Sequence, residues 1–198
     1  DYSPYYQAGI RNEIKINDKC SAQILTLNGW QNISENNSSK SIGMQLNYTP
    51  TSSLSFIYNN FIGHENGLRH FHDFIVKATV SDFYTCGAQV DVGFQETNSQ
   101  NHQWYGFSFI NSFNLSPLVA LNLRGEYYSD PHQVIINTQN SAPFKVWGAS
   151  IGIDYKPIKN LLYRFETRSL LAQNAIFQSK SGNKNNQTVL AFSMGLTF

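Results

Sequence analysis

The sequence predicts an all-β protein: an antiparallel up-and-down transmembrane β-barrel formed by a single domain over residues 1–198. Three observations favour this fold class. Apolar and polar residues alternate strictly along many segments. This repeat of two residues is the one expected of a strand with one apolar and one polar face. Charged residues make up only 14% and aromatic residues 14% of the chain, whereas about 25% of a typical soluble domain is charged. Short turns and longer polar loops also follow one another regularly, as in bacterial outer-membrane barrels.

The last segment shows the alternation best. Every second position of 190–198 is large and apolar, while intervening residues such as Ser193 and Gly195 are small or polar. Residues 147–155 repeat this pattern. A period of two indicates strands with one apolar and one hydrophilic face.

The same pattern predicts eleven strands along the chain. Most are longer than the roughly five to six residues usual in soluble sheets. They approach the roughly 9–11 residues with which a tilted strand crosses a bilayer. The expected ranges are 5–16, 20–30, 41–48, 53–62, 70–80, 83–95, 104–114, 118–128, 144–155, 161–169 and 188–198.

Short and long connections alternate between these strands. Turns are expected at 17–19, 50–52, 81–82, 114–117 and 156–160, and loops at 31–40, 63–69, 96–103, 129–143 and 169–187. Because turns of such barrels face the periplasm, the C-terminus is expected at the periplasmic side. Single-chain bacterial barrels have even strand numbers. The odd count therefore predicts at least one further strand upstream, so the chain is expected to be the C-terminal portion of a larger barrel.

Composition excludes several other classes. The mean hydropathy is −0.35, and no apolar run approaches the roughly 18 residues of a membrane helix. A net charge of +1 provides no basic surface for nucleic acid. Cys20 and Cys86 are far apart and have no CxxC partner, so they indicate neither a metal site nor a redox motif. Whether they ever pair stays open, and no cofactor is expected.

A soluble β-sandwich is the alternative fold, because its strands also alternate apolar and polar residues. Long strands and one-sided loops favour the barrel instead. So do aromatic residues near the predicted strand ends, which suit the interfacial girdles of membrane barrels. These residues are Tyr5, Tyr6, Tyr48, Tyr84, Trp104, Tyr105, Tyr127, Tyr128, Tyr155 and Tyr163.

Most charged residues fall on the polar face of the predicted strands. An Arg or Lys on the lipid face costs about 2–4 kcal/mol near the bilayer midplane, so these residues are expected to face the lumen. They could simply pair across neighbouring strands and hydrate the wall, or form a mixed-charge lining that sets which solutes pass; both can hold. The expected lining residues are Arg11, Glu13, Lys15, Asp73, Lys77, Asp91, Arg124, Glu126, Asp154, Arg164, Glu166 and Arg168.

The histidines raise the alternative of an outer-membrane hydrolase. His64, His70 and His72 lie around one predicted loop with Glu65 and Asp73, but the sequence alone cannot bring a base, a nucleophile and an orienting group together. His70 and His72 share a strand face, yet two ligands do not make a metal site. No catalytic residue and no metal is therefore expected.

Several segments in matching order resemble the OmpL-like β-barrel porins of Bacteroidota. They are NGWQNISENN at 28–37, QLNYTP at 45–50, YNNFIG at 58–63, LRHFHD at 68–73 and LRGEYYSD at 123–130. The terminal Phe198 is similar to the aromatic residue of the insertion signal read by the outer-membrane assembly machinery. Family members are longer at the N-terminus, which agrees with the odd strand count.

The resemblance implies a multi-pass barrel in the outer membrane of a Gram-negative bacterium. Its expected partners are outer-membrane lipid, the assembly machinery and small hydrophilic solutes that diffuse passively through it. A homo-oligomer is left open. Besides the hydrolase, a structural or adhesive barrel whose loops bind partners remains an alternative.

Overall fold

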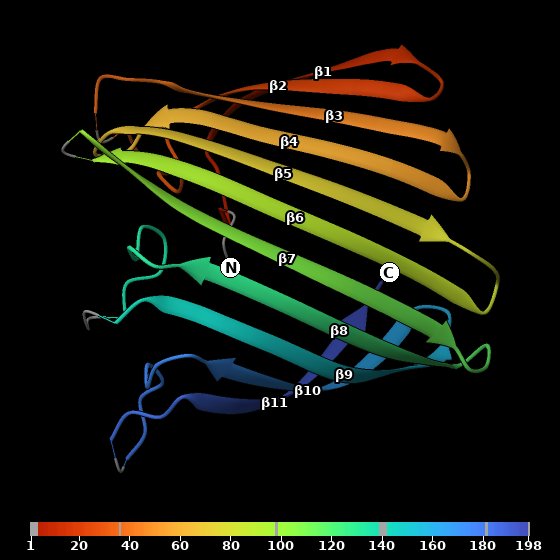
Figure 1. The fold of residues 1–198 in the computed structure, drawn as a ribbon. Helices are drawn as coiled ribbons and strands as arrows, with labels where there is room; N and C mark the ends of the chain where they lie inside the picture. Colours follow the sequence, from red (N-terminus) through yellow and green to blue (C-terminus); the bar gives the residue numbers. More distant parts are fainter. Residues whose placement is uncertain (1–3, 36, 98, 139–141, 181, 198) are drawn as a thin grey trace.

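The computed structural model describes residues 4–35, 37–97, 99–138, 142–180 and 182–197. Over these residues the chain forms one sheet of 11 strands, in which every strand pairs with its neighbours in chain order (Figure 1). All pairings are antiparallel. No helix of the described residues is long and apolar enough to cross a membrane. The predicted all-β up-and-down architecture is confirmed.

Each strand is long, and the predicted number of strands is correct. The bounds are β1 (Gly9–Asn17), β2 (Cys20–Leu27), β3 (Ser41–Thr51), β4 (Leu54–His64), β5 (Leu68–Thr79), β6 (Tyr84–Thr97), β7 (Gln100–Asn114), β8 (Val119–Asp130), β9 (Phe144–Ile158), β10 (Leu161–Ala172) and β11 (Asn186–Leu196).

Several predicted strand ends were wrong. β7 begins at Gln100 rather than at 104, because its backbone ladder with β6 continues to the pair Thr97–Gln100 beyond the apolar alternation. The first strand begins at Gly9 rather than at 5, since the chain before it leaves the sheet. The second strand ends at Leu27 rather than at 30, and Gly29 has a φ of 139°, which only glycine adopts readily.

The two kinds of connection lie at opposite ends of the sheet. Figure 1 shows the long connections at the left ends of the strands and the short ones at the right ends. We call these the loop end and the turn end. The long connections follow β2, β8 and β10, and the short ones follow β1, β3, β5, β7 and β9. The connections after β4 and β6 also lie at the loop end, although both are shorter than predicted.

The strand register aligns apolar residues on one face of the sheet and polar residues on the other. Phe74, Val90 and Phe107 are direct cross-strand neighbours on β5, β6 and β7, and they are 53%, 47% and 40% exposed. Asp73 and Asp91, on the other face of the same strands, are 6% and 0% exposed. A water-soluble sheet has the opposite arrangement. We call the apolar face the outer face and the polar face the inner face.

A compact aromatic cluster covers the inner face at the loop end. Its buried members are Leu27, Trp30, Phe61, Phe71, Trp104 and Tyr128. The Trp30 ring meets the rings of Phe61 and Phe71 edge-on, with centroids 5.0 and 5.1 Å apart, a favourable aromatic geometry. This inner cluster contradicts the girdle prediction for two residues.

Trp104 and Tyr128 face inward and are not interfacial girdle residues. Trp104 is fully buried, and it stands opposite Gly93 on β6. A Cβ atom at Gly93 would overlap the indole ring, so this glycine makes the inward position of Trp104 possible. Their chain neighbours Tyr105 and Tyr127 lie on the outer face, with ring centroids 6.0 Å apart.

The sheet has two edges within the described residues. Among them, β1 and β11 each pair with a single strand. The upstream strand expected from the sequence stays a prediction, and Phe198 lies outside the described residues.

The two faces of β6 provide a matched test of the outer face. We expect Val90→Arg to cost about 2–4 kcal/mol of stability on folding into lipid vesicles, because a cation near the bilayer midplane meets hydrocarbon. Gln89→Arg, one residue earlier on the inner face, should fold normally. Urea titration of the vesicle-bound protein measures both. Equal destabilisation by the two changes would contradict a hydrocarbon-facing outer face.

Candidate functional site

The inner face is the candidate site, since the register gathers the predicted lining residues there. Asp73 faces Asp91 across β5 and β6, Arg124 faces Ser150 across β8 and β9, and Asp154 faces Arg164 across β9 and β10. The remaining predicted residues belong to the same face: Lys77, Glu126, Glu166 and Arg168 on these strands, and Arg11, Glu13 and Lys15 on β1. Their sharing of one face follows from period-two alternation.

Glu126 is the centre of the largest group of ion pairs. Its nearly buried carboxylate binds Arg124 from its own strand and Arg168 from β10, and the Arg168 Nε donates to Glu126 Oε1 at 2.7 Å. The carboxylate reaches β10 by crossing β9 above Gly148, where a Cβ atom would overlap it. Two cations thus share one anion.

The Asp154–Arg164 pair lies nearer to the turn end. The Arg164 Nε and Nη2 donate to the two carboxylate oxygens of Asp154, both at 2.6 Å. This two-pronged geometry is among the strongest for a charged pair. Glu166 follows Arg164 on the same face and lies with Arg124 and Arg164 around a hollow of about 170 Å³.

Asp73 and Asp91 form an acidic pair in the middle of the face. The Asn59 Nδ2 donates to Asp73 Oδ2 at 2.7 Å, and the Gln45 Nε2 donates to the Asn59 side-chain oxygen at 2.7 Å. A row of hydrogen bonds therefore runs from β3 to β5. The Asn59 amide supports the Asp73 carboxylate without neutralising it.

The charges of β1 lie at an edge of the described sheet. Arg11, Glu13 and Lys15 stand opposite Leu25, Gln23 and Ser21 of β2, and all of β1 is exposed. The Lys15 ammonium binds Asp18 of the following turn at 2.6 Å. Such an exposed pair contributes little to stability.

Sequence reasoning missed Arg69, which is buried within the aromatic cluster. Its guanidinium lies 5.0 Å from the Trp30 ring centroid and 5.6 Å from that of Trp104, and its Nε donates to Gln95 at 2.6 Å. The available signal was its alternation with Phe71 and Asp73. It was overlooked because the predicted strand began at residue 70.

A second missed feature is the segment after β8, which folds inward. The Asp130 carboxylate accepts the backbone N–H groups of Val134, Ile135 and Ile136 at 2.8, 2.8 and 3.1 Å. These three side chains pack against the aromatic cluster. The segment 131–138 therefore narrows the inner face at the loop end instead of extending away from it.

The histidines are divided between different places. His70 and His72 lie on the outer face, where the His72 Nδ1 is 2.8 Å from the Tyr58 hydroxyl, whereas Asp73 lies on the inner face. The Glu65 carboxylate accepts the Trp30 backbone N–H at 2.6 Å. The described residues contain no group of three or more His, Cys, Asp or Glu side chains that could hold a metal ion. The hydrolase alternative gains no support from this geometry.

Comparisons with known proteins agree with this architecture. A family model described as "Putative beta-barrel porin-2, OmpL-like" matches residues 1–198. The NanC porin structure is 8% identical with a TM-score of 0.58, and the match covers 98% of this chain and 97% of that one. The outer membrane channel DcaP of Acinetobacter baumannii is 11% identical with a TM-score of 0.64, covering 93% of this chain and 61% of that one.

At such low identities these two structures indicate a shared fold and nothing finer. Among proteins with curated functions, none has a significantly similar sequence.

Removal of the Asp130 carboxylate tests the inward segment. We expect Asp130→Ala to free residues 131–138, because each hydrogen bond to a charged group is worth about 1.5–3 kcal/mol. Proteinase K should then cleave the segment at least about tenfold faster than in the wild type. Asp82→Ala, in an exposed turn, is the control and should leave cleavage unchanged. Equal cleavage of Asp130→Ala and the wild type would contradict this anchoring role.

Proposed function

The chain belongs to the OmpL-like β-barrel porin family, and we propose that it forms the wall of an outer-membrane channel for passive diffusion of small hydrophilic solutes. Family membership makes the protein a porin-like outer-membrane β-barrel, and it supports the proposal that the protein is a channel rather than an enzyme. The kind of solute, the orientation in the membrane and the lining residues are parts of the proposal. The narrower assignment to Bacteroidota stays a prediction.

The observation that carries the proposal is the inversion of the two faces. Phe74, Val90 and Phe107 are exposed on the outer face, where hydrocarbon would cover them. Charged side chains occupy the inner face of β5, β6, β8, β9 and β10. A lipid-embedded sheet with a charged inner face supports a water-filled path along that face.

The lining charges support a weakly selective path. Ion pairs such as Asp154–Arg164 hydrate the wall. The opposite charges within each pair largely cancel at a distance, so the pair contributes little to the field in the pore. Glu126, by contrast, is shared by two arginines. Rings and clusters of charged side chains set the ion preference of pores, so this group is proposed to favour anions.

Orientation, partners and assembly complete the proposal. The long connections would lie outside the cell and the short turns, with the C-terminus, in the periplasm. The outer face would contact membrane lipid, and Phe198 would be part of the signal that the outer-membrane assembly machinery recognises. Oligomeric state is left open.

Single-channel recording of the whole protein that carries this sequence tests the channel. We expect stable conductance in planar bilayers. Glu126→Gln should raise the chloride-to-potassium permeability ratio at least about threefold, since one charge at about 7 Å in water changes the energy of each ion by about 0.6 kcal/mol. Glu35→Gln, in a connection at the loop end, should not change the ratio. Circular dichroism checks that both variants fold. If the folded wild type did not conduct, the channel proposal would be refuted.

Cysteine labelling on whole cells tests the orientation. In a background without Cys20 and Cys86, a cysteine at Ser38 or Asn185 should react with an impermeant maleimide, because these connections would face the medium. A cysteine at Asn17 or Ser52 should react only after the outer membrane is disrupted. The reverse pattern would show the opposite orientation.

A further inference from the structure

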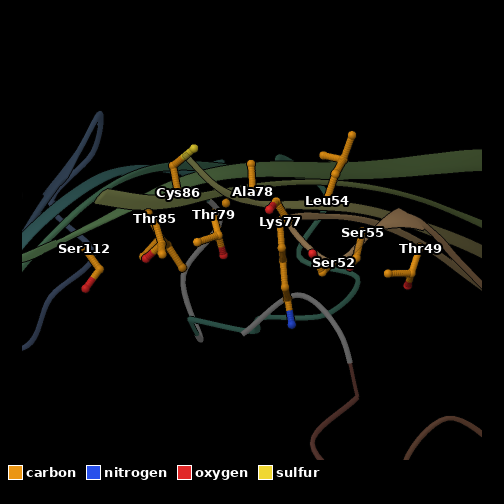
Figure 2. A pocket seen from close by; sticks show the side chains of 13 residues that line it. Thr49, Ser52, Leu54, Ser55, Lys77, Ala78, Thr79, Thr85, Cys86 and Ser112 are labelled. Carbon is orange, nitrogen blue, oxygen red and sulfur yellow. The ribbon is translucent and has the colours of Figure 1, made fainter. Parts of the chain in front are cut away.

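A hydroxyl-rich hollow lies on the inner face at the turn end. Its volume is about 390 Å³, and residues of β3 to β7 and the β3–β4 turn line it. Figure 2 shows hydroxyl side chains projecting into it together with Lys77, whereas Leu54, Ala78 and Cys86 project to the opposite side. We call this space the turn-end hollow. Its labelled hydroxyl residues are Thr49, Ser52, Ser55, Thr79, Thr85 and Ser112.

The strand register builds this arrangement. Lys77 stands between Ser55 of β4 and Gly87 of β6. Because Gly87 has no side chain, the stem of Lys77 has free space beside it, and its Cγ would lie 3.9 Å from a Cβ at Gly87. Thr79 and Thr85 face each other across β5 and β6. Threonine suits a strand and still provides a hydroxyl.

Lys77 differs electrostatically from the three arginines of β8 and β10 on the inner face. Arg124, Arg168 and Arg164 each have a carboxylate partner. Lys77 is exposed, and within the described part of the chain it has neither an ion pair nor a hydrogen bond.

None of the described residues that line the turn-end hollow is acidic. The carboxylate of Asp73 belongs to the same face of β5, but four residues away, about 13 Å along a strand. The hollow therefore holds one uncompensated positive charge.

We propose that the turn-end hollow is a binding site for small oxyanions that pass through the channel; this inference rests on the proposed function. An ammonium group supplies positive charge and three donors. Hydroxyl groups add donors to the remaining oxygens of the anion and bring no negative charge. A neutral sugar would also find hydroxyl partners, but it would gain nothing from the charge of Lys77. The site should therefore bind oxyanions more tightly than neutral solutes of similar size.

Block of the chloride current by inorganic phosphate tests the site in the whole protein in planar bilayers. We expect phosphate on the turn-end side to reduce the wild-type current saturably. Lys77→Gln should raise the half-blocking concentration about tenfold, because a charge-assisted interaction is lost. Lys15→Gln is the matched control: Lys15 also belongs to the inner face, but it is already paired with Asp18. Its half-blocking concentration should stay within about twofold of the wild type.

A double variant separates a binding site from a general positive field. Thr79→Val with Thr85→Val removes two hydroxyls and keeps β-branched side chains in the strands. We expect it to weaken the phosphate block and leave the reversal potential in a KCl gradient unchanged. A block that depends on Lys77 but not on these hydroxyls would overturn the proposed site. A wild type that conducts but is not blocked by phosphate would also overturn the proposed site. A folded wild type that does not conduct would instead refute the channel function.

Discussion

Backbone hydrogen bonding is the constraint on which this structure depends. Hydrocarbon offers no water to unpaired N–H and C=O groups, so a membrane-spanning strand needs a partner along its whole length. Within the described residues the ladder from β1 to β11 meets this need on both sides of β2 to β10, and it also forces consecutive residues to opposite faces. Phe74 therefore lies on the outer face because its chain neighbour Asp73 lies on the inner one. The pairing that forms the wall also separates its apolar surface from its charged one.

At Glu126 and Asp154 the inner face provides partners that make the burial of a charge tolerable. A nearly buried carboxylate such as Glu126 needs partners, because an isolated ion in a poorly hydrated place is strongly destabilised. Arg124 and Arg168 approach it from two strands, and Asp154 and Arg164 are joined by two hydrogen bonds. These pairs stiffen neighbouring strands at small net charge. In the proposed channel, selectivity would then depend on the charges that are not fully compensated, the shared Glu126 group and Lys77 among them.

The fold was largely predictable because period-two alternation encodes both the strands and their faces. The same parity places Asp73, Arg124 and Arg164 on one face without any structure. Alternation could not show that Glu126 reaches across β9 to Arg168. This contact depends on the register, which puts Gly148, a residue without a side chain, between the two. Trp104 was misassigned because closeness to a strand end suggested a girdle position, although alternation puts it on the face opposite to its neighbour Tyr105. Gly93 leaves room for its ring on the inner face.

Along the inner face, the loop end and the turn end differ in kind. Apolar rings, the buried Arg69 and the segment 131–138 narrow the loop end. The turn end instead has hydroxyl side chains around Lys77. A permeating solute must be bound strongly enough to enter but weakly enough to leave. One lysine among hydroxyls meets both conditions better than a cluster of arginines, because its single hydrated charge attracts an anion without the multiple fixed donors that would retain it.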